Sequence, residues 1–384
     1  MNRQRKLGIF VFIVSSSMAA FACAVPGTER APDVGATPDQ ILVEPTTTSV
    51  TPPTETPIPP TATLVPVIHE ENVEMMTDVL TLGGHGNVIR DLEFSPDSAR
   101  LVVGTGGSSA RDINRLHLWD VNTGDLIAVS DELNTITWDL EYSPDGESIV
   151  TAMGDGTVKL WGADDLTPLQ IYPHAGDVNS VAISPDGRYM AAGVAESGGG
   201  FVVIQQDGAS IRRFWAHPYS VPSMDFSPTG QFLATGAVDR SVKVWQVSDG
   251  RLVETLLQDG QGTSVVFSPD GSLLASGMCA LSDAQIKCSQ GEIWAWNVPE
   301  WDLIRTFRGP VDWVEDVDFS PNMSLVAGGG RDFAVYLWQL RDARLLRTLA
   351  GHAGPVAAVN FSPDGTMLAT GSSDETVKIW KITP

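Results

Sequence analysis

Three histidines lie in contexts that resemble parts of a catalytic triad. Each is followed by an aspartate and then a tryptophan, in the sets His85, Asp112 and Trp119; His217, Asp239 and Trp245; and His352, Asp374 and Trp380. A histidine that is oriented by a carboxylate and faces a hydroxyl can act as a general base. Because the same set occurs three times in one chain, we expect it to satisfy buried polar groups rather than to catalyse a reaction.

Other patterns typical of enzymes are missing from the sequence. It contains no Gly-x-Ser-x-Gly elbow, no Walker loop and no His-Glu-x-x-His pair. The glycine-rich run at 104–107 has no helical segment behind it, which argues against a dinucleotide site. The sequence therefore predicts no catalytic residue and no cofactor.

The composition is strongly acidic. The 384 residues carry a formal net charge of −23. Binding to a phosphate backbone depends on clustered Lys and Arg side chains, so this charge argues against a nucleic-acid partner. Hydrophobic residues make up 42% of the chain, which is enough for a large core.

The amino terminus has the features of a secretory signal. Basic residues, a short apolar stretch and small residues predict a signal peptide over residues 1–22. Its end resembles a permissive bacterial lipobox, in which Cys23 becomes lipidated and anchors the protein to a membrane. Ordinary cleavage after Ala22 or Ala24 is the alternative. In either case we expect an exported, extracytoplasmic protein.

Residues 23–75 have the composition of a disordered spacer. They are rich in Pro and Thr and contain almost no aromatic residue. Such sequence buries too little apolar area to fold and favours extended polyproline geometry, in which about 50 residues reach on the order of 150 Å. We expect this spacer to hold a folded head, residues 76–384, clear of a membrane.

A short turn motif recurs seven times. Each copy contains Ser-Pro, and the prolines are Pro96, Pro144, Pro185, Pro228, Pro269, Pro321 and Pro363. Proline fixes φ, and the residues after it favour a tight turn. Apolar runs on either side have the length and composition of buried strands. A strand ending in Trp follows six of the turns, and the third repeat has Ile204 in its place.

These features resemble the WD-repeat family of β-propellers, as a secreted or lipoprotein-type bacterial member. The likeness covers about Leu80 to Ile382. The match is closest at Gly84-His85, Trp119-Asp120, Gly351-His352 and 373–380. The resemblance implies an all-β fold, a seven-bladed β-propeller of four-stranded antiparallel blades. The array begins with a lone strand at 79–82, which we expect to complete the last blade and close the ring.

The resemblance also assigns roles to the histidine sets. In the family a His, a strand hydroxyl, a turn Asp and the Trp bond to one another within a blade, and the hydroxyls here would be Ser108, Thr235 and Thr370. The first set departs from the pattern, because Asp112 lies one residue further from its Trp than the other aspartates do.

Two cysteines beyond Cys23 lie close together in one expected hairpin. If Cys23 carries lipid, Cys279 and Cys288 remain as a pair, which outside the cytoplasm can form a disulfide worth about 2–3 kcal/mol in the chain-entropy model. Two free thiols are the alternative. Metal binding is not expected, because no His or further Cys stands near at ligand spacing.

Residues near the starts of the innermost strands are candidates for partner binding. Counting back from the turns selects Arg90, Trp138, Asn179 and Glu315, with Arg111, Trp313 and Arg331 near them. In the WD-repeat family such positions often contact partners, and aromatic and Arg side chains dominate binding hot spots. The alternative is that Trp138 and Trp313 plug the channel or pack against a neighbouring blade.

Three aspartates share a second equivalent position and could form an acidic ring at the channel mouth: Asp91, Asp139 and Asp316. Oxygen ligands suit Ca²⁺ or another hard cation. A solvated acidic rim is the simpler interpretation, and we assign no metal.

Together these observations predict a non-catalytic scaffold that binds a protein or peptide at the channel-mouth face, as a monomer displayed outside the cytoplasmic membrane. Two alternatives stay open. One is a metal-assisted hydrolase or lyase that uses the acidic ring. The other is a glycan- or wall-binding module that uses the tryptophans outside the repeat pattern, Trp215, Trp294 and Trp301. The fold by itself does not choose between them.

Overall fold

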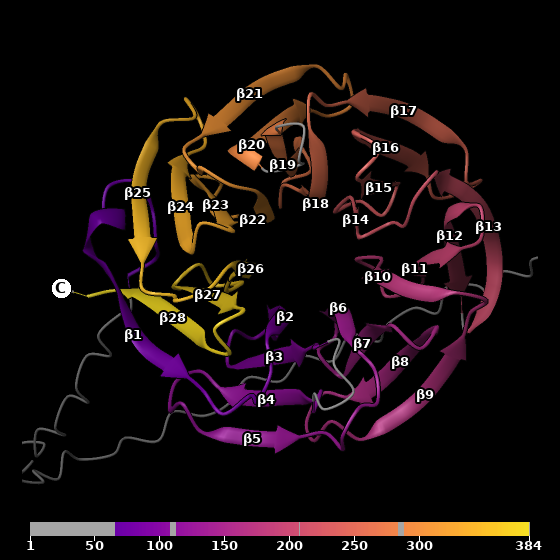
Figure 1. The fold of residues 1–384 in the computed structure, drawn as a ribbon, viewed down its shortest axis with the longest axis horizontal. Coiled ribbons are helices and arrows are strands. Elements are labelled where there is room, and N and C mark those ends of the chain that lie inside the picture. Colours follow the sequence, from indigo (N-terminus) through magenta and orange to yellow (C-terminus); the bar gives the residue numbers. More distant parts are fainter. Residues whose placement is uncertain (1–65, 108–112, 207, 283–287, 384) are drawn as a thin grey trace, which may run out of the picture. The chain divides into compact units, whose positions relative to one another are not determined.

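The computed structural model describes residues 66–107, 113–206, 208–282 and 288–383. Within these ranges the chain forms seven four-stranded antiparallel sheets, arranged as the blades of a ring around a central channel (Figure 1). The predicted seven-bladed propeller is confirmed. The signal peptide, Cys23 and most of the spacer lie outside the described residues, as do Ser108, Arg111 and Asp112.

Each blade runs from an innermost strand beside the channel to an outermost strand at the rim. Blades one and two contain β2 (Ile89–Phe94), β3 (Arg100–Thr105), β4 (Leu116–Asp120) and β5 (Leu126–Val129), then β6 (Thr137–Tyr142), β7 (Ser148–Met153), β8 (Thr157–Gly162) and β9 (Pro168–Pro173). Blades three and four contain β10 (Asp177–Ile183), β11 (Met190–Glu196), β12 (Gly199–Gln206) and β13 (Ala209–His217), then β14 (Ser223–Phe226), β15 (Phe232–Ala237), β16 (Ser241–Gln246) and β17 (Leu252–Leu257).

The remaining blades follow the same order. Blades five and six contain β18 (Gln261–Phe267), β19 (Leu273–Ser282), β20 (Cys288–Asn297) and β21 (Leu303–Arg308), then β22 (Val314–Phe319), β23 (Leu325–Gly330), β24 (Ala334–Gln339) and β25 (Leu345–Ala350). Blade seven combines β26 (Val356–Phe361), β27 (Met367–Ser372) and β28 (Val377–Ile382) with the amino-terminal β1 (Met76–Leu82). A short 3-10 helix, η1 (Val73–Met75), precedes β1.

The Ser-Pro motifs form the turns between the innermost and second strands. In blade one Ser95 Oγ donates to Asp97 Oδ1 at 2.6 Å and accepts from the Arg100 N–H at 2.9 Å. The turn of blade two ends in Gly146, whose φ of 72° lies in the region that favours glycine.

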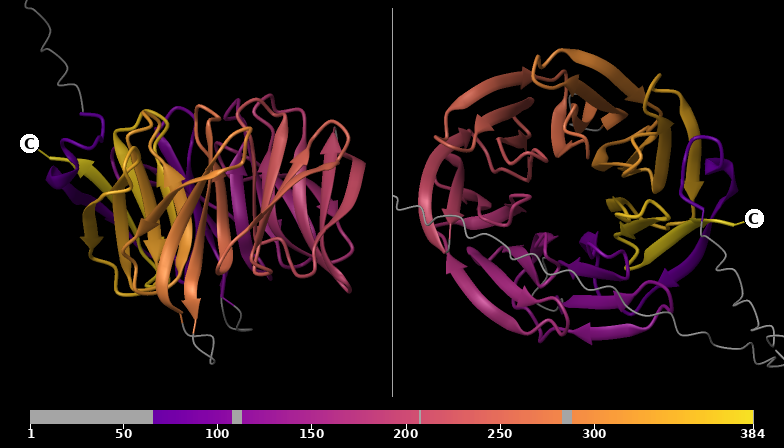
Figure 2. Two further views of the ribbon diagram at one scale, coloured as in Figure 1. Left: turned by 90° about the horizontal axis from the view of Figure 1, so that it is seen from above. Right: turned by 180° about the vertical axis from the view of Figure 1, so that it is seen from behind.

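Adjacent innermost strands run in the same direction, since contacts between β2 and β6 advance along both strands together. All seven Ser-Pro turns therefore lie on one face of the ring, which we call the turn face. The opposite face, where the innermost strands begin, is the mouth face. Figure 2 shows the blades from the side and from behind.

The amino-terminal strand closes the ring as predicted. β1 pairs antiparallel with β28, from Met76 opposite Ile382 to Leu82 opposite Val377. The strand is longer than the predicted 79–82, because its first residues also pair and Met76 is fully buried. In Figure 1 the indigo β1 lies beside the yellow β28, so segments from the two ends of the described chain share one sheet.

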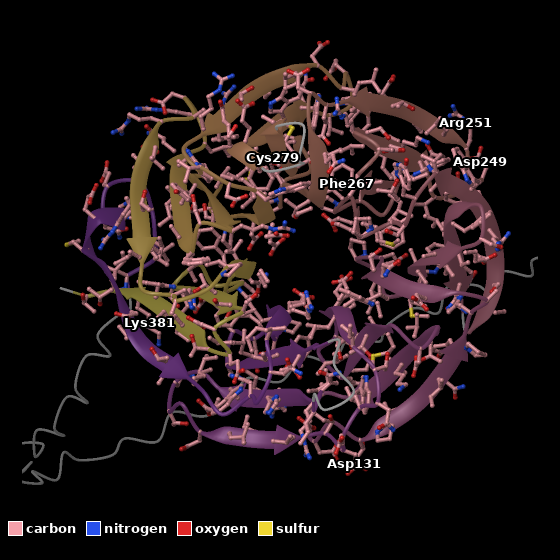
Figure 3. The ribbon with its side chains drawn as sticks, in the orientation of Figure 1. Asp131, Asp249, Arg251, Phe267, Cys279 and Lys381 are labelled. Carbon is pink, nitrogen blue, oxygen red and sulfur yellow. A yellow bond between two sulfur atoms is a disulfide. The ribbon has the colours of Figure 1, made fainter. Side chains whose placement is uncertain are left out.

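Apolar side chains fill the interfaces between adjacent blades. Figure 3 shows Phe267, from an innermost strand, nearer the channel than Asp249 and Arg251, which lie at the rim. In six blades the repeat tryptophan packs against the preceding blade, as Trp161 does against blade one. These interfaces are the core of the propeller.

Blade three differs from the others at the tryptophan position. Strand register places Gln205 there, because it pairs with Met190 as Trp380 pairs with Leu368. The prediction that Ile204 occupies this position is wrong. Ile204 packs instead toward blade four. The error arose because the strand is apolar at several successive positions, so composition does not reveal which side chains face which neighbour.

Residues 66–75, which the sequence analysis placed in the spacer, pack against blades six and seven. The Ile68 N–H donates to Gly365 O at 2.8 Å, and Ile68 O accepts from Asn322 Nδ2 at 2.9 Å. Ile68 and Val73 are each only 1% exposed. These apolar residues follow no helical or strand periodicity, so the sequence does not predict that they are buried. Their burial depends on the groove that blades six and seven form together. Within the described ranges, no helix is long and apolar enough to cross a membrane.

Candidate functional site

Blades four and seven each contain a complete buried polar set. His217 Nδ1 lies 3.0 Å from Asp239 Oδ2, and His217 Nε2 lies 2.9 Å from Thr235 Oγ1. Trp245 Nε1 donates to the same hydroxyl at 2.9 Å. The corresponding distances in blade seven are 3.1, 2.8 and 3.0 Å for His352, Asp374, Thr370 and Trp380. The structure therefore brings both sets together as the resemblance implies.

In blade seven both ring nitrogens of His352 have a hydrogen-bond partner. Burial lowers the pKa of His352, which favours the neutral imidazole. Burial acts to raise the pKa of Asp374, but hydrogen bonds from Thr376 and the Ala353 N–H outweigh it and lower this pKa to about 2. A neutral His352 that donates to Asp374 must accept from Thr370, whose oxygen accepts from Trp380. The hydroxyl is thus engaged inside the blade, which fits a stabilising role.

We expect Thr370→Val to destabilise the propeller by about 2–4 kcal/mol. The change leaves the Trp380 N–H and His352 Nε2 buried without a partner, and each unsatisfied group costs about 1–3 kcal/mol. Urea denaturation followed by tryptophan fluorescence measures the free energy of unfolding. The matched control is Thr77→Val, on an exposed hydroxyl of β1, with an expected effect within about 0.5 kcal/mol. Equal effects from both variants would contradict the assigned role.

In blade one the register does not support the predicted set. Val103 pairs with His117 as Thr235 pairs with Lys243, so a valine occupies the hydroxyl position. β3 ends at Thr105, before Ser108, and the predicted Ser108 and Asp112 lie outside the described residues.

His85 forms a different contact in this blade. Its ring packs edge-on against His117 at 4.9 Å and Trp119 at 5.5 Å between centroids, and its Nδ1 lies 3.1 Å from Glu375 O of blade seven. Burial lowers the pKa of His85, and it lowers the pKa of His117 to about 4. Sequence reasoning assigned no role to His117, because the repeat pattern does not select its position.

The predicted partner-binding residues that are described lie toward the mouth face. The Arg90 guanidinium lies 5.2 Å from the centroid of the Trp138 ring, and Arg90 Nε donates to Gly106 O at 2.7 Å. Arg90, Trp138 and Glu315 line a channel cavity of about 390 Å³. Asn179 belongs to the innermost strand of blade three, and its Oδ1 is buried with no hydrogen-bond partner among the described residues.

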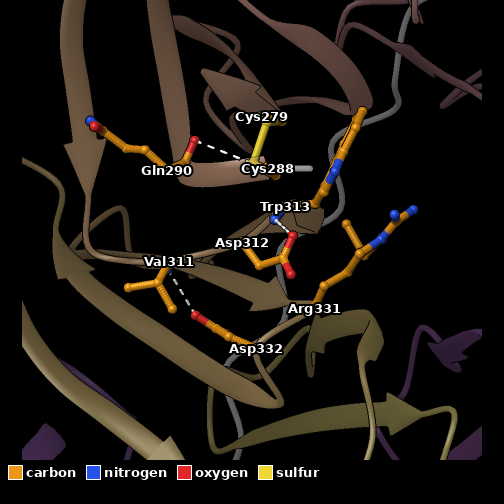
Figure 4. Close-up of a disulfide and its surroundings, with 9 residues drawn as sticks. Cys279, Cys288, Gln290, Val311, Asp312, Trp313, Arg331 and Asp332 are labelled. Carbon is orange, nitrogen blue, oxygen red and sulfur yellow. Dashed lines mark hydrogen bonds and ion pairs between the residues drawn. A yellow bond between two sulfur atoms is a disulfide. The ribbon is translucent and has the colours of Figure 1, made fainter. Parts of the chain in front are cut away.

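Blade six presents a second arginine–tryptophan pair. The Arg331 guanidinium lies 4.9 Å from the Trp313 centroid, and Arg331 makes an ion pair with Glu315. Trp313 is only 8% exposed and packs against the Cys279–Cys288 disulfide, which joins β19 to β20 in blade five (Figure 4). The structure thus contains the expected disulfide. It also gives Trp313 a packing role, whereas Trp138 is only partly buried.

Acidic side chains line the channel in two layers. The layer nearer the mouth contains the predicted Asp91, Asp139 and Asp316. Each uses Oδ2 to accept a backbone N–H from the next blade, at 2.8–2.9 Å, and the donors are Leu140, Val181 and Val359. These carboxylates therefore link neighbouring blades and lie inside the channel.

The second layer lies two residues further along the same three strands and includes one residue of β14 as well. Its carboxylates, Glu93, Glu141, Asp225 and Asp318, accept the backbone N–H groups of Tyr142, Ile183, Phe267 and Phe361. Asn360 does the same with a neutral amide, since its Oδ1 accepts from the Phe94 N–H at 3.0 Å. Sequence reasoning missed this layer. The two-residue spacing within each strand could have revealed it, because residues i and i+2 share one face.

Burial raises the pKa of all seven channel carboxylates. It reaches about 7 for Asp139 and Asp225 and about 8 for Asp318. Repulsion from neighbouring carboxylates adds to the effect of burial for Asp91 and Glu93. Among the described residues, no group of three or more His, Cys, Asp or Glu side chains is placed to hold a metal ion. The lining is therefore a hydrogen-bonded set of carboxylates that share limited contact with water.

The three tryptophans outside the repeat pattern do not form one surface. Trp215 is 47% exposed on β13, with Lys243 Nζ 4.7 Å from its ring centroid. Trp294 and Trp301 pack against the cluster between blades four and five. Two of the three side chains therefore serve packing within the propeller.

A closed ring of seven four-stranded blades, linked at the channel and completed by an amino-terminal strand, defines a repeat β-propeller. The family model described as "WD domain, G-beta repeat" matches the chain seven times, over 76–111, 127–162, 166–204, 208–246, 254–288, 301–339 and 343–381. The chain therefore belongs to the WD40 repeat family. Propellers of this family generally bind protein partners.

Relatives of the chain share the repeat over part of their length. It is 28% identical over 197 residues to transcription initiation factor TFIID subunit 5 of Caenorhabditis elegans, covering 50% of this chain and 29% of that protein. It is 29% identical over 240 residues to periodic tryptophan protein 2 of Arabidopsis thaliana, covering 62% and 25%. It is 32% identical over 143 residues to an uncharacterised WD repeat-containing protein of Synechocystis, covering 36% and 40%. The chain thus spans less than half the length of each of these relatives.

Proposed function

We propose that the protein is a non-catalytic scaffold that binds a protein or peptide partner on the mouth face of its propeller. The observation that carries this proposal is the pair of Arg90 and Trp138, whose side chains line the channel cavity at its mouth. Aromatic and Arg side chains on a rigid frame are the usual components of binding hot spots. The carboxyl groups of the channel beneath them can form hydrogen bonds with a polar group that the partner inserts at the mouth.

We extend the proposal to the site of action. The protein is exported, is anchored to a membrane through lipid on Cys23, and acts as a monomer. The features that support this part of the proposal are the signal-like amino terminus and Cys23 at its end. Ile68 contacts Gly365 and Asn322 in Ser-Pro turns. The chain thus joins the propeller at the turn face.

The contacts of the channel carboxylates favour the scaffold over a channel enzyme. Asp91, Asp139 and Asp316 each accept an N–H from a neighbouring blade. A hydrolase would need them to activate water or hold a metal, and this would compete with bonds that join the blades. The glycan alternative is weakened by the packing of Trp294 and Trp301 inside the propeller.

We expect Trp138→Ala to lower partner affinity at least tenfold, since truncation of a central hot-spot residue costs about 2 kcal/mol or more. The partner is captured from a native surface extract with the folded head, identified by mass spectrometry, and its dissociation constant is then measured by calorimetry. Trp138 is the better target because Trp313 also packs against the disulfide.

The matched control is Trp215→Ala, which removes an exposed tryptophan from the outer rim. Its affinity should equal that of the wild type. If Trp138→Ala and Trp215→Ala bind the partner as the wild type does, the mouth face is not the interface. Equal melting temperatures for the variants separate a binding defect from a folding defect.

A further inference from the structure

The interface between blades two and three contains an open groove on the turn face. It has a volume of about 510 Å³ and is lined by Val150, Leu160 and Tyr172 of blade two and by Met190 and Gln205 of blade three. The groove lies where the other interfaces receive the repeat tryptophan of the following blade. Blade three has Gln205 at that position, so the ring that would fill this space is missing.

The equivalent groove between blades six and seven is filled by the chain itself. Trp380 occupies the position of Gln205, and Ile68 packs beside it against Leu337 and Leu349. The register makes Leu337 the counterpart of Leu160 and Leu349 the counterpart of Tyr172. The propeller thus shows what such a groove accepts, namely an extended segment that inserts an apolar side chain.

The backbone contact of that segment has a counterpart as well. The Ile68 N–H donates to the carbonyl of Gly365, the glycine of the blade-seven turn. Gly187 is the same residue of the blade-three turn and lines the open groove. An extended peptide in this groove can donate a backbone N–H to Gly187 in the same way.

One of the lining residues, Gln205, has a buried side-chain oxygen without a hydrogen-bond donor among the described residues. Gln205 is only 5% exposed, and the oxygen is its Oε1. A buried acceptor left unsatisfied costs about 1–3 kcal/mol, which a ligand recovers if it supplies an N–H. In blades two, four and seven the tryptophan Nε1 donates to a buried hydroxyl. An indole ring therefore matches both the empty volume and the free acceptor.

We propose that the groove between blades two and three is a second binding site, which accepts an extended peptide from a partner protein and buries a tryptophan of that peptide against Gln205. The site lies on the face opposite the channel mouth, so it does not depend on the function proposed above. The peptide plays the part that the segment Pro66–Ile68 plays between blades six and seven.

The probe is an acetylated and amidated Pro-Val-Trp-Thr peptide. Its first three residues copy Pro66–Ile68, with tryptophan in place of Ile68. Titration calorimetry with the folded head measures its affinity. We expect saturable binding that falls at least tenfold when alanine replaces the tryptophan of the peptide. We also expect N-acetyltryptophanamide, which has the ring without the extended backbone, to bind at least tenfold more weakly than the peptide. Absence of saturable binding, or equal affinity for the alanine peptide, would overturn the proposal.

Two variants locate the site. Gln205→Trp supplies the ring found in the other blades, so it should raise the melting temperature and lower peptide affinity at least tenfold. Gln205→Leu keeps the groove but removes the acceptor, so the tryptophan peptide should lose its advantage over one with 2-naphthylalanine, which has no N–H. Trp138→Ala is the control and should bind the peptide as the wild type does. Unchanged affinity in both Gln205 variants would place the binding elsewhere and refute the proposal.

Discussion

A chain that begins at Gly83 is expected to lose cooperative folding, whereas one that begins at Ala62 should fold as the full chain does. The shorter chain lacks β1 and the segment before it, which bury Ile68, Val73, Met76 and Leu82. Burial of each such side chain contributes about 1.5–3 kcal/mol. Their sum of roughly 6–12 kcal/mol is comparable to the stability of a typical domain. Thermal melting followed by circular dichroism measures the loss.

A synthetic peptide with the sequence of residues 66–82 provides the matched control. Added in excess to the chain that begins at Gly83, it should restore a cooperative transition, because it can pair with β28 in the same register. A cooperative transition in the shortened chain without this peptide, near the melting temperature of the longer chain, would show that the ring does not depend on β1.

The second large effect is a loss of stability as the pH rises from 6.5 to 8.5. The pKa of Asp225 is raised to about 7 and that of Asp318 to about 8, chiefly by burial, whereas an unfolded aspartate titrates near 4. Between about pH 4 and pH 8 the folded state therefore binds protons that the unfolded state does not. The free energy of unfolding falls as the pH rises through this window. Melting temperatures at several pH values test the direction.

The buried histidines act in the opposite direction but at lower pH. Burial lowers the pKa of His85, His117 and His352, so their contribution to stability grows as the pH rises and is complete near the unfolded value of 6.5. Measurement above pH 6.5 therefore isolates the carboxylates.

Two substitutions of Asp318 separate the effect of its titration from that of its hydrogen bond with the Phe361 N–H. Asp318→Asn should raise stability at pH 8.5 and flatten the pH dependence, because an amide oxygen can still accept the Phe361 N–H, as Asn360 does for Phe94. Asp318→Ala should lose about 1–3 kcal/mol, since that N–H is left without an acceptor. Asp249→Asn, on the rim (Figure 3), is the control and should leave the pH profile unchanged. A profile that Asp318→Asn does not alter would show that this carboxylate does not drive the effect.

The repeat pattern predicted seven similar units, and the resemblance to the WD-repeat family implied that each unit is a four-stranded blade. Seven Ser-Pro turns separated by apolar runs predict seven units, because turn chemistry and strand composition act over a few residues and are visible in any window of the sequence. The Cys279–Cys288 pair belongs to the same category, since both residues lie within one hairpin. Closure by an amino-terminal strand followed from counting strands at the two ends of the array.

Only the tertiary structure shows which side chains of a strand face the neighbouring blade and how deeply they are buried. The sequence placed Ile204 at the tryptophan position, but pairing of β11 with β12 puts Gln205 there and leaves a groove beside it. The acidic ring was expected as a solvated rim, whereas Asp91 and its counterparts accept N–H groups from the next blade inside the channel.

The amino-acid sequence by itself determined the local elements, their repetition and the closing strand, because these depend on neighbours within a few tens of residues and on the count of repeats. The tertiary structure decided which side chains face which blade, where Ile68 and Val73 are buried, and which polar atoms lack a partner. Those features depend on contacts between blades. Each of them is formed by two segments that are far apart in the sequence. Neither segment has a local pattern that reveals the contact.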